Sequence, residues 1–282
     1  MEYTLINHHN PSEMSARIAE IKELDLSKTS LNEVKKILST SMPMPYNTFL
    51  QNPGGYVYRG QTNDDEVPFD RISRISFNPS PSTKAQRASL PGDIVFYASN
   101  GIGIVAHEAI QDEYRKTGRK VYHATVGKWR IKNPLSVMIV CHSRKALEAG
   151  TDIVKALVAL ERGMRNNHYN DAQIEAWQMR SEFLSDEFAK EKITCEQDYY
   201  FSAAWASYLF SKLDNCDGII YPSVTYAYKG HNFAYRANLI KDGKIVLSEV
   251  SFLKIEVNSS GMIKYEIVAT TNSFDEDKII WI

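Results

Sequence analysis

The chain has 282 residues, 43% hydrophobic and 24% charged, which is the composition of an ordinary soluble globular protein. Lys and Arg number 33 against 34 Asp and Glu, so the formal net charge of -1 excludes a strongly basic nucleic-acid binder, and we expect no directly bound nucleic acid. The three cysteines show no CxxC spacing, which indicates neither a zinc site nor a disulfide framework, and we expect no metal.

The first residues lack the basic and apolar segments of a signal peptide, and no apolar run approaches the ~20 residues that cross a bilayer. We therefore expect a cytoplasmic protein that does not contact a membrane.

Residues 1–52 have the pattern of a helical N-terminal extension. Ile18, Ile21 and Leu24 recur at helical spacing, and Ser30 to Glu33 has the form of a capping box that opens a second helix. Asn52-Pro53-Gly54-Gly55 is a turn sequence. We expect a domain boundary there, between an extension (1–52) and a catalytic domain (53–282).

The next segments alternate between strand and helix patterns. Strands are predicted at 56–59, 93–97, 120–127 and 135–141, with a polar loop before the second and a helix over 102–116 before the third. From residue 218 the pattern is again β, with turns at Asp242-Gly243 and Ser260-Gly261.

Residues 143–214 differ from their surroundings because their apolar residues form helical stripes. The three stripes are Leu147, Val154, Leu157 and Val158; Ile174, Trp177, Leu184 and Phe188; and Trp205, Tyr208, Leu209 and Leu213. Each stripe needs a surface to bury it, so we expect a helical insertion beside the β core. The order of elements indicates an α+β fold.

Two strand ends carry side chains suited to a binding site. Tyr221-Pro222 ends an apolar strand, because proline gives no N–H to a sheet, and Ser223 follows either as a site residue or as a turn residue. Arg59 ends another strand and offers a planar set of donors to a phosphate or carboxylate, or forms a salt bridge.

Glu108 has small or apolar neighbours, Ala106, Ala109 and Ile110, near the start of a predicted helix. Such a carboxylate either has a functional reason to be partly buried or interacts with the helix dipole. Arg71 and Arg74 precede Phe77-Asn78 in a loop, which fits a nucleotide ligand or a solvated loop of mixed charge.

Taken in order, several of these segments form one pattern. They are VYRG (57–60), FNPSP (77–81), DIVFYAS (93–99), AHE (106–108), DGIIYPS (217–223) and GHNFA (230–234). Over roughly residues 53–240 this pattern resembles the RES-domain family, named for its Arg, Glu and Ser. By motif these catalytic residues are Arg59, Glu108 and Ser223.

The resemblance implies an ADP-ribosyltransferase-like β core and an NAD-consuming toxin of a toxin–antitoxin pair. NAD is then a substrate that loses nicotinamide to water or phosphate, no cofactor is needed, and a protein antitoxin is a partner. A transferase acting on a macromolecule and a non-catalytic nucleotide-binding module stay open as alternatives, as does a homo-oligomer.

The resemblance also implies roles for individual side chains. Arg59 binds the pyrophosphate, Glu108 stabilises the positively charged ribose, and Ser223 orients the ligand by hydrogen bonding. Tyr58 or Tyr97 stacks on the nicotinamide ring.

The family loop usually has Gly-Arg before its aromatic residue. Here Ser76 precedes Phe77 and the nearest arginine is Arg74, so we expect Arg74 and Asn78 to bind substrate.

Overall fold

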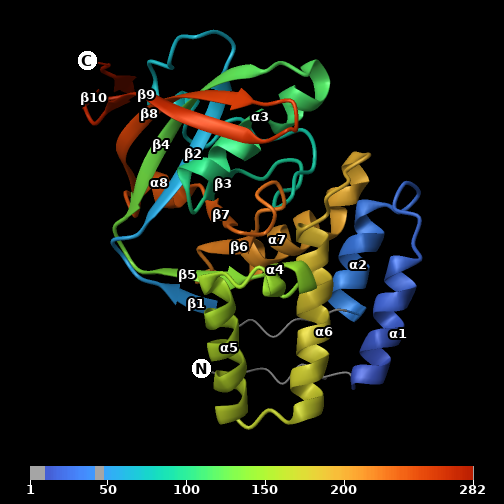
Figure 1. The fold of residues 1–282 in the computed structure, drawn as a ribbon. Helices are drawn as coiled ribbons and strands as arrows, with labels where there is room; N and C mark the ends of the chain where they lie inside the picture. Colours follow the sequence, from blue (N-terminus) through green and yellow to red (C-terminus); the bar gives the residue numbers. More distant parts are fainter. Residues whose placement is uncertain (1–9, 42–47, 282) are drawn as a thin grey trace. The chain divides into compact units, whose positions relative to one another are not determined.

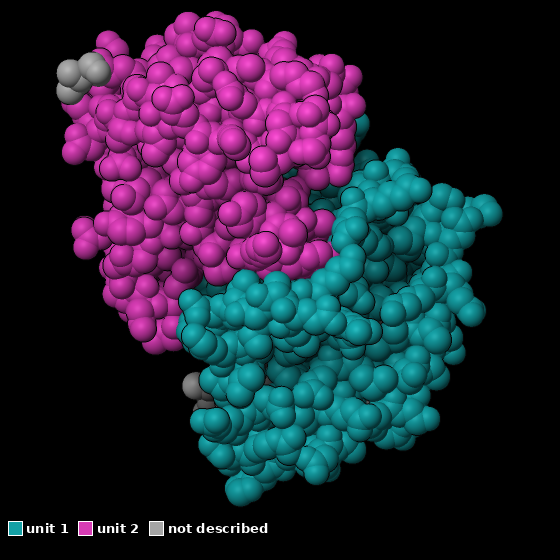
Figure 2. Space-filling view, in the orientation of Figure 1, with its two compact units in different colours: residues 1–49, 82–93, 136–222 teal, residues 50–81, 94–135, 223–282 magenta. Residues whose placement is uncertain are grey.

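The computed structural model describes residues 10–41 and 48–281 of the chain (Figure 1). They form two compact units, each assembled from three separate segments (Figure 2). Unit 1 comprises residues 1–49, 82–93 and 136–222, and unit 2 comprises residues 50–81, 94–135 and 223–282. One division falls between residues 49 and 50, near the boundary expected at residue 53, but the N-terminal helices group with two later segments instead of standing apart.

An antiparallel sheet with strand order β7-β3-β2-β4-β8-β9 is the framework of unit 2 (Figure 1). Its strands are β2 (Tyr56–Asn63), β3 (Val95–Ser99), β4 (Val121–Ile131), β7 (His231–Arg236), β8 (Ile245–Val257) and β9 (Ile263–Thr271). Strand β3 begins two residues later than predicted. The reason is local: Asp93 Oδ2 accepts the backbone N–H of Leu90 at 2.9 Å and keeps residues 90–93 in a turn.

Helix α3 (Ile102–Thr117) covers one face of this sheet, which confirms the helix predicted over 102–116. Val105, Ala106 and Ile110 are buried against strands β4 and β8. Close approach to β2 depends on Gly60, because a Cβ there would lie 3.1 Å from Val105 Cγ1 and 2.8 Å from a backbone oxygen. The helix ends at Gly118, which has the left-handed conformation (φ 60°) that glycine adopts readily.

The opposite face of the sheet is covered by the loop after β2 and by the C-terminal segment. Ile75, Val250 and Ile279 form a small core there, and Trp281 Nε1 donates to the Phe69 carbonyl at 2.9 Å. The short elements of unit 2 are the 3₁₀ helix η1 (Ile72–Arg74), α8 (Asn238–Lys241), β10 (Phe274–Asp275) and β11 (Lys278–Ile279). Two distant parts of the chain therefore form one surface layer.

Unit 1 is mainly helical, with one parallel strand pair, β5 (Leu135–Ile139) and β6 (Gly218–Pro222). Its helices are α1 (Pro11–Lys22), α2 (Leu31–Ser41), α4 (Arg144–Glu148), α5 (Asp152–Asn166), α6 (Asp171–Phe188), η2 (Glu196–Tyr199) and α7 (Tyr200–Lys212). Strand β1 (Thr48–Gln51) spans the division between the units. Helix α1 packs on α6 and α2 packs on α7. The predicted capping box is confirmed, since the Ser30 N–H donates to Glu33 Oε2 at 2.7 Å and the Glu33 N–H donates to Ser30 Oγ at 3.3 Å.

Helices dominate residues 143–214 as predicted, and together with the sheets they confirm the α+β class. The first and third stripes are correct only in part. Leu157, Trp205 and Leu209 are buried as predicted, whereas Leu147 is 40% exposed, Val158 53% and Tyr208 39%. Gly150, at φ 64°, separates α4 from α5, so Leu147 does not continue the face of α5, whose buried positions are Ile153, Leu157 and Met164.

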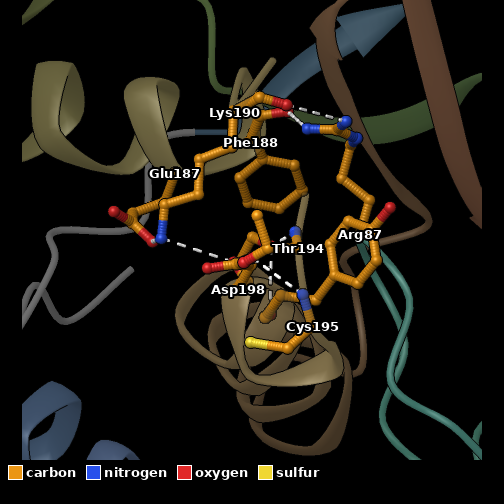
Figure 3. Close-up of polar contacts among 9 residues, drawn as sticks. Arg87, Glu187, Phe188, Lys190, Thr194, Cys195 and Asp198 are labelled. Atoms are coloured by element: carbon orange, nitrogen blue, oxygen red, sulfur yellow. Dashed lines mark hydrogen bonds and ion pairs between the residues drawn. The ribbon is translucent and has the colours of Figure 1, made fainter. Parts of the chain in front are cut away.

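Residues 82–93 are fixed within unit 1 through Arg87 (Figure 3). Its guanidinium donates to the backbone carbonyls of Phe188 and Lys190, the latter at 3.1 Å, and lies 5.6 Å from the ring centre of Tyr199. The carbonyls at a helix C-terminus lack partners in the helix and carry partial negative charge. A single arginine therefore caps the end of α6 and anchors a segment about a hundred residues earlier in the chain.

Candidate functional site

Glu108 lies in the second turn of α3 and is half-buried. Its Oε1 accepts two hydrogen bonds, from Ser223 Oγ at 2.8 Å and from Asn232 Nδ2 at 2.8 Å. Hydrogen bonds to a carboxylate are stronger than neutral ones, so two of them fix the rotation of the group. A glutamate interacts favourably with the helix dipole in the first turn of a helix. Glu108 lies beyond that turn, so its position is explained by the two hydrogen-bond donors and not by the dipole.

Ser223 is fully buried and stands directly after strand β6. Its N–H donates to the Gly230 carbonyl and its own carbonyl accepts the Tyr228 N–H, both at 2.9 Å. The loop between them contains Ala227 at φ 49° and Tyr228 at φ 62°, left-handed conformations that cost energy in residues other than glycine. The loop is therefore held in one shape, and Ser223 both begins this turn and contacts Glu108 through its side chain.

The Ser223 hydroxyl takes part in a short relay of hydrogen bonds. It carries one proton, which it donates to Glu108, so Thr225 Oγ1, 3.2 Å away, is the donor toward Ser223 Oγ. The relay runs from Thr225 through Ser223 to the carboxylate of Glu108. Two hydroxyl groups are thus oriented toward one oxygen, Glu108 Oε1.

Asn232 also contacts Glu108, and the sequence reasoning missed it. It lies opposite Ser99 in the β3–β7 register, and both side chains are buried. Ser99 Oγ donates to Asn232 Oδ1 at 2.6 Å, which leaves the amide Nδ2 to donate to Glu108. Both residues belong to segments of the family-like pattern, DIVFYAS and GHNFA, and this was the signal that could have identified them.

His107 lies beside this cluster and is half-buried. Its ring meets the edge of Tyr226 with centroids 5.0 Å apart, and it hydrogen-bonds to the backbone of Thr225. Burial lowers the pKa of His107 below its ordinary value, and this outweighs the opposing effects of the Thr225 hydrogen bond and the Glu108 charge. The ring is neutral at pH 7 and fixes the loop after Ser223.

Arg59 is not brought into direct contact with Glu108 or Ser223. Its Nε donates to the Ser76 carbonyl at 2.8 Å, its Nη1 donates to the Tyr97 carbonyl at 2.9 Å, and the guanidinium lies 5.5 Å from the ring centre of Phe96. Alternation along β2 directs Arg59 to the face opposite α3. In this structure the arginine ties the loop after η1 to strand β3.

The two tyrosines expected to stack on a ligand share the α3 face of the sheet. Tyr58 pairs with Ser99 across β2 and β3, and Tyr97 lies two residues from Ser99 on the same strand. Both are half-buried. Tyr58, Tyr97 and the Ser99–Asn232 pair therefore face the side of the sheet that carries Glu108.

Arg74 and Asn78 lie apart from this cluster and are exposed. The Arg74 guanidinium stacks on Phe69 at 4.4 Å from the ring centre. Asn78 Oδ1 accepts the Ser80 N–H at 3.0 Å, the geometry of an Asx turn. Both contacts shape the loop that Arg59 holds.

Comparison with the known protein-family models finds no match for this chain, and no curated protein is significantly similar to it. Within residues 10–41 and 48–281, no group of three or more His, Cys, Asp or Glu side chains is arranged to hold a metal ion. In the same described part of the chain, every helix is too short or too polar to cross a lipid bilayer.

Proposed function

We propose that the protein consumes NAD by cleaving the bond between nicotinamide and ribose, and that unit 2 has an ADP-ribosyltransferase-like core. The observation that carries the proposal is the carboxylate of Glu108, held through Oε1 by Ser223 and Asn232 on a sheet face that also carries Tyr58 and Tyr97. The resemblance of the sequence to the RES-domain family supports the choice of NAD.

Cleavage of this bond passes through a ribose with oxocarbenium character, because the C–N bond breaks ahead of attack by the acceptor. Nicotinamide leaves as a neutral molecule with the bonding electron pair, so its departure needs no proton. With water as acceptor, NAD⁺ and H₂O give ADP-ribose, nicotinamide and H⁺; with inorganic phosphate, the product is ADP-ribose 1″-phosphate. A fixed anion beside the ribose stabilises the transition state more than the ground state.

In this scheme Glu108 supplies that anion through Oε2 while Oε1 stays engaged with its two donors. Its half-buried position keeps the carboxylate accessible to a ligand and reduces screening by water. Tyr58 and Tyr97 offer aromatic rings to nicotinamide. Ser223 is fully buried and positions the carboxylate. It is not a nucleophile in the proposal, because its proton is donated to Glu108.

Arg59 has an indirect role in the proposal. It lies on the face of the sheet opposite α3, and its contacts with the Ser76 and Tyr97 carbonyls shape the loop that carries Asn78 and Arg74. The pyrophosphate contact that the family resemblance implies is therefore not part of the proposal. Following the family resemblance, the activity is that of a toxin, and a protein antitoxin restrains it.

The test is incubation of the purified full chain with NAD labelled in the nicotinamide ring and, separately, in the adenylate. We expect free nicotinamide with wild type and none with a Glu108→Ala variant purified in the same way. ADP-ribose or its 1″-phosphate identifies the acceptor as water or phosphate, and adenylate label retained on protein or nucleic acid identifies a transferase. NAD binding without nicotinamide release would overturn the proposal in favour of a nucleotide-binding module.

A further inference from the structure

Strand β9 ends the unit 2 sheet on one side, with β8 as its neighbour (Figure 1). It presents apolar side chains to solvent: Tyr265 is 43% exposed, Ile267 50% and Val268 55%. Proteins normally protect a long apolar sheet edge, because its unpaired backbone groups pair readily with another strand. This edge therefore points to an interaction surface.

The regular part of the edge is residues 263–267. Phe252 pairs with Ala269 and Leu253 pairs with Ile267, so Val268 forms a bulge that interrupts the edge beyond Ile267. Before the bulge the strand is fixed from behind. Ile263 packs on the core under α3, and a Cβ at Gly103 of α3 would lie 3.2 Å from Tyr265 Cε1.

The direction of the backbone groups follows from the β8–β9 register. Val257 donates its N–H to the Lys120 carbonyl, away from β9, so its pair with Ile263 is not hydrogen-bonded. Pairs of the two kinds alternate along an antiparallel ladder. Lys264 and Glu266 therefore bond to β8, whereas Ile263, Tyr265 and Ile267 direct N–H and C=O to the open edge.

This pattern is complementary to itself. In an antiparallel arrangement centred on Tyr265, Tyr265 lies opposite Tyr265 of a second copy and Ile263 lies opposite Ile267. These are the residues with outward backbone groups, and each such pair exchanges two hydrogen bonds. The apolar side chains meet on one face of the extended sheet.

On the other face the same register brings Lys264 opposite Glu266 of the second copy. Within the chain, Lys264 is already opposite Glu256 and Glu266 opposite Lys254, and these charges attract one another. In this arrangement, Glu266 of the second copy lies beside Lys264, so positive and negative side chains continue to alternate from strand to strand. A strand of unrelated sequence would have to supply an acidic and a basic residue in this register, so the two charges select against other strands.

We propose that the protein forms a dimer in which β9 pairs antiparallel with β9 of a second copy, about a two-fold axis at Tyr265. The interface is isologous, since one segment supplies both sides. It joins two unit 2 sheets into one continuous sheet. The proposal does not depend on the proposed function, because β9 carries none of the residues of the candidate site.

The first experiment is sedimentation of the full chain over a range of micromolar concentrations. Wild type is expected to dimerise. Glu266→Lys and Lys264→Glu each place like charges opposite one another twice in the dimer, and each should raise the dimer dissociation constant by about tenfold or more. Glu20→Lys makes the same charge change as Glu266→Lys, but at an exposed position of α1. It is the matched control and should dimerise as wild type does.

Mixing the two weakened variants gives the sharpest result. The acidic edge of Lys264→Glu then faces the basic edge of Glu266→Lys, and a heterodimer with complementary charges should form. Hydrogen exchange gives an independent readout: the amides of Ile263, Tyr265 and Ile267 should gain protection on dimerisation, while those of Lys264 and Glu266 are protected in the monomer too. A wild-type monomer at every concentration, or a dimer without this alternating protection, would overturn the proposal.

Discussion

Replacing Glu108 with glutamine removes one negative charge and keeps the shape of the side chain. Ser223 and Asn232 both donate to Oε1, so glutamine retains these bonds by placing its carbonyl oxygen there. Its NH₂ group then occupies the position of Oε2, where the proposed mechanism needs an anion. The variant should fold, because the cost is that of two charge-assisted hydrogen bonds becoming neutral ones, about 1–2 kcal/mol.

The effect on catalysis follows from the charge. An anion and a cation about 4 Å apart attract by about 4 kcal/mol at the effective dielectric constant of about 20 that suits partly buried sites. Because the ribose becomes cationic only as the bond breaks, this energy is lost from the transition state. At about 1.4 kcal/mol for each factor of ten, turnover should fall about a thousandfold, with little change in NAD affinity.

The assay is nicotinamide release at saturating NAD, with thermal melts of both proteins. Glu113→Gln, which removes a charge from the same helix outside the cluster, is the matched control and should retain wild-type turnover. Turnover of Glu108→Gln within a few-fold of wild type, in a protein that melts normally, would refute the assignment of Glu108 to the reaction.

Three further predictions concern Asn232, Arg59 and His142. Asn232→Leu keeps the volume but deletes the donor to Glu108, so turnover should fall about tenfold to a hundredfold in the nicotinamide assay. Arg59→Ala deletes the charge-assisted bonds to the Ser76 and Tyr97 carbonyls, so the free energy of unfolding should fall by about 1.5–3 kcal/mol, while NAD affinity measured by calorimetry should change little. Burial lowers the pKa of His142, whose ring meets the edge of Trp177, from 6.5 to about 4. Between pH 6.5 and pH 4 His142 is therefore protonated in the unfolded chain but not in the folded chain. The free energy of unfolding from urea titrations should fall by about 2–3 kcal/mol toward pH 4.

Each of these three predictions has an outcome that would contradict it. Unchanged turnover in Asn232→Leu would mean that Ser223 alone positions the carboxylate. A loss of NAD affinity in a folded Arg59→Ala would assign the guanidinium to the pyrophosphate. For His142, the variant His142→Phe keeps the ring but cannot titrate, so an equally steep loss of stability in that variant would assign the pH dependence to other groups.

The sequence predicted individual helices and strands because the spacing of apolar residues and the capping side chains act within a few residues of the chain. The helix at α3 was predicted from the spacing of Ile104, Val105, Ala109 and Ile110, and the start of α2 from the Ser30 and Glu33 pair, whose hydrogen bonds are reciprocal. The contact between Glu108 and Ser223 was within reach only through the order of motifs, since they lie 115 residues apart.

What the sequence did not reveal depends on register and on non-local packing. Asn232 reaches Glu108 because β3 and β7 pair with Ser99 opposite it, and no local signal specifies that pairing. Likewise, Arg59 contacts the Ser76 carbonyl on the face of β2 opposite α3, a face set by how the whole sheet is covered. The two compact units were also hidden, because each combines three segments with no compositional boundary.

The interleaving of the two units has a consequence for the chain during its synthesis. Helix α3 with Glu108 emerges early, but its hydrogen-bond partners, Ser223 and Asn232, belong to the last segment, 115 and 124 residues later. At roughly 5–20 residues per second, a ribosome needs about 6–25 s to cover that interval. A nascent chain thus carries an unpartnered carboxylate while the next 115 to 124 residues are made, and a fragment truncated before residue 223 lacks the cluster altogether. The proposed activity would arise only after residue 232 has been made.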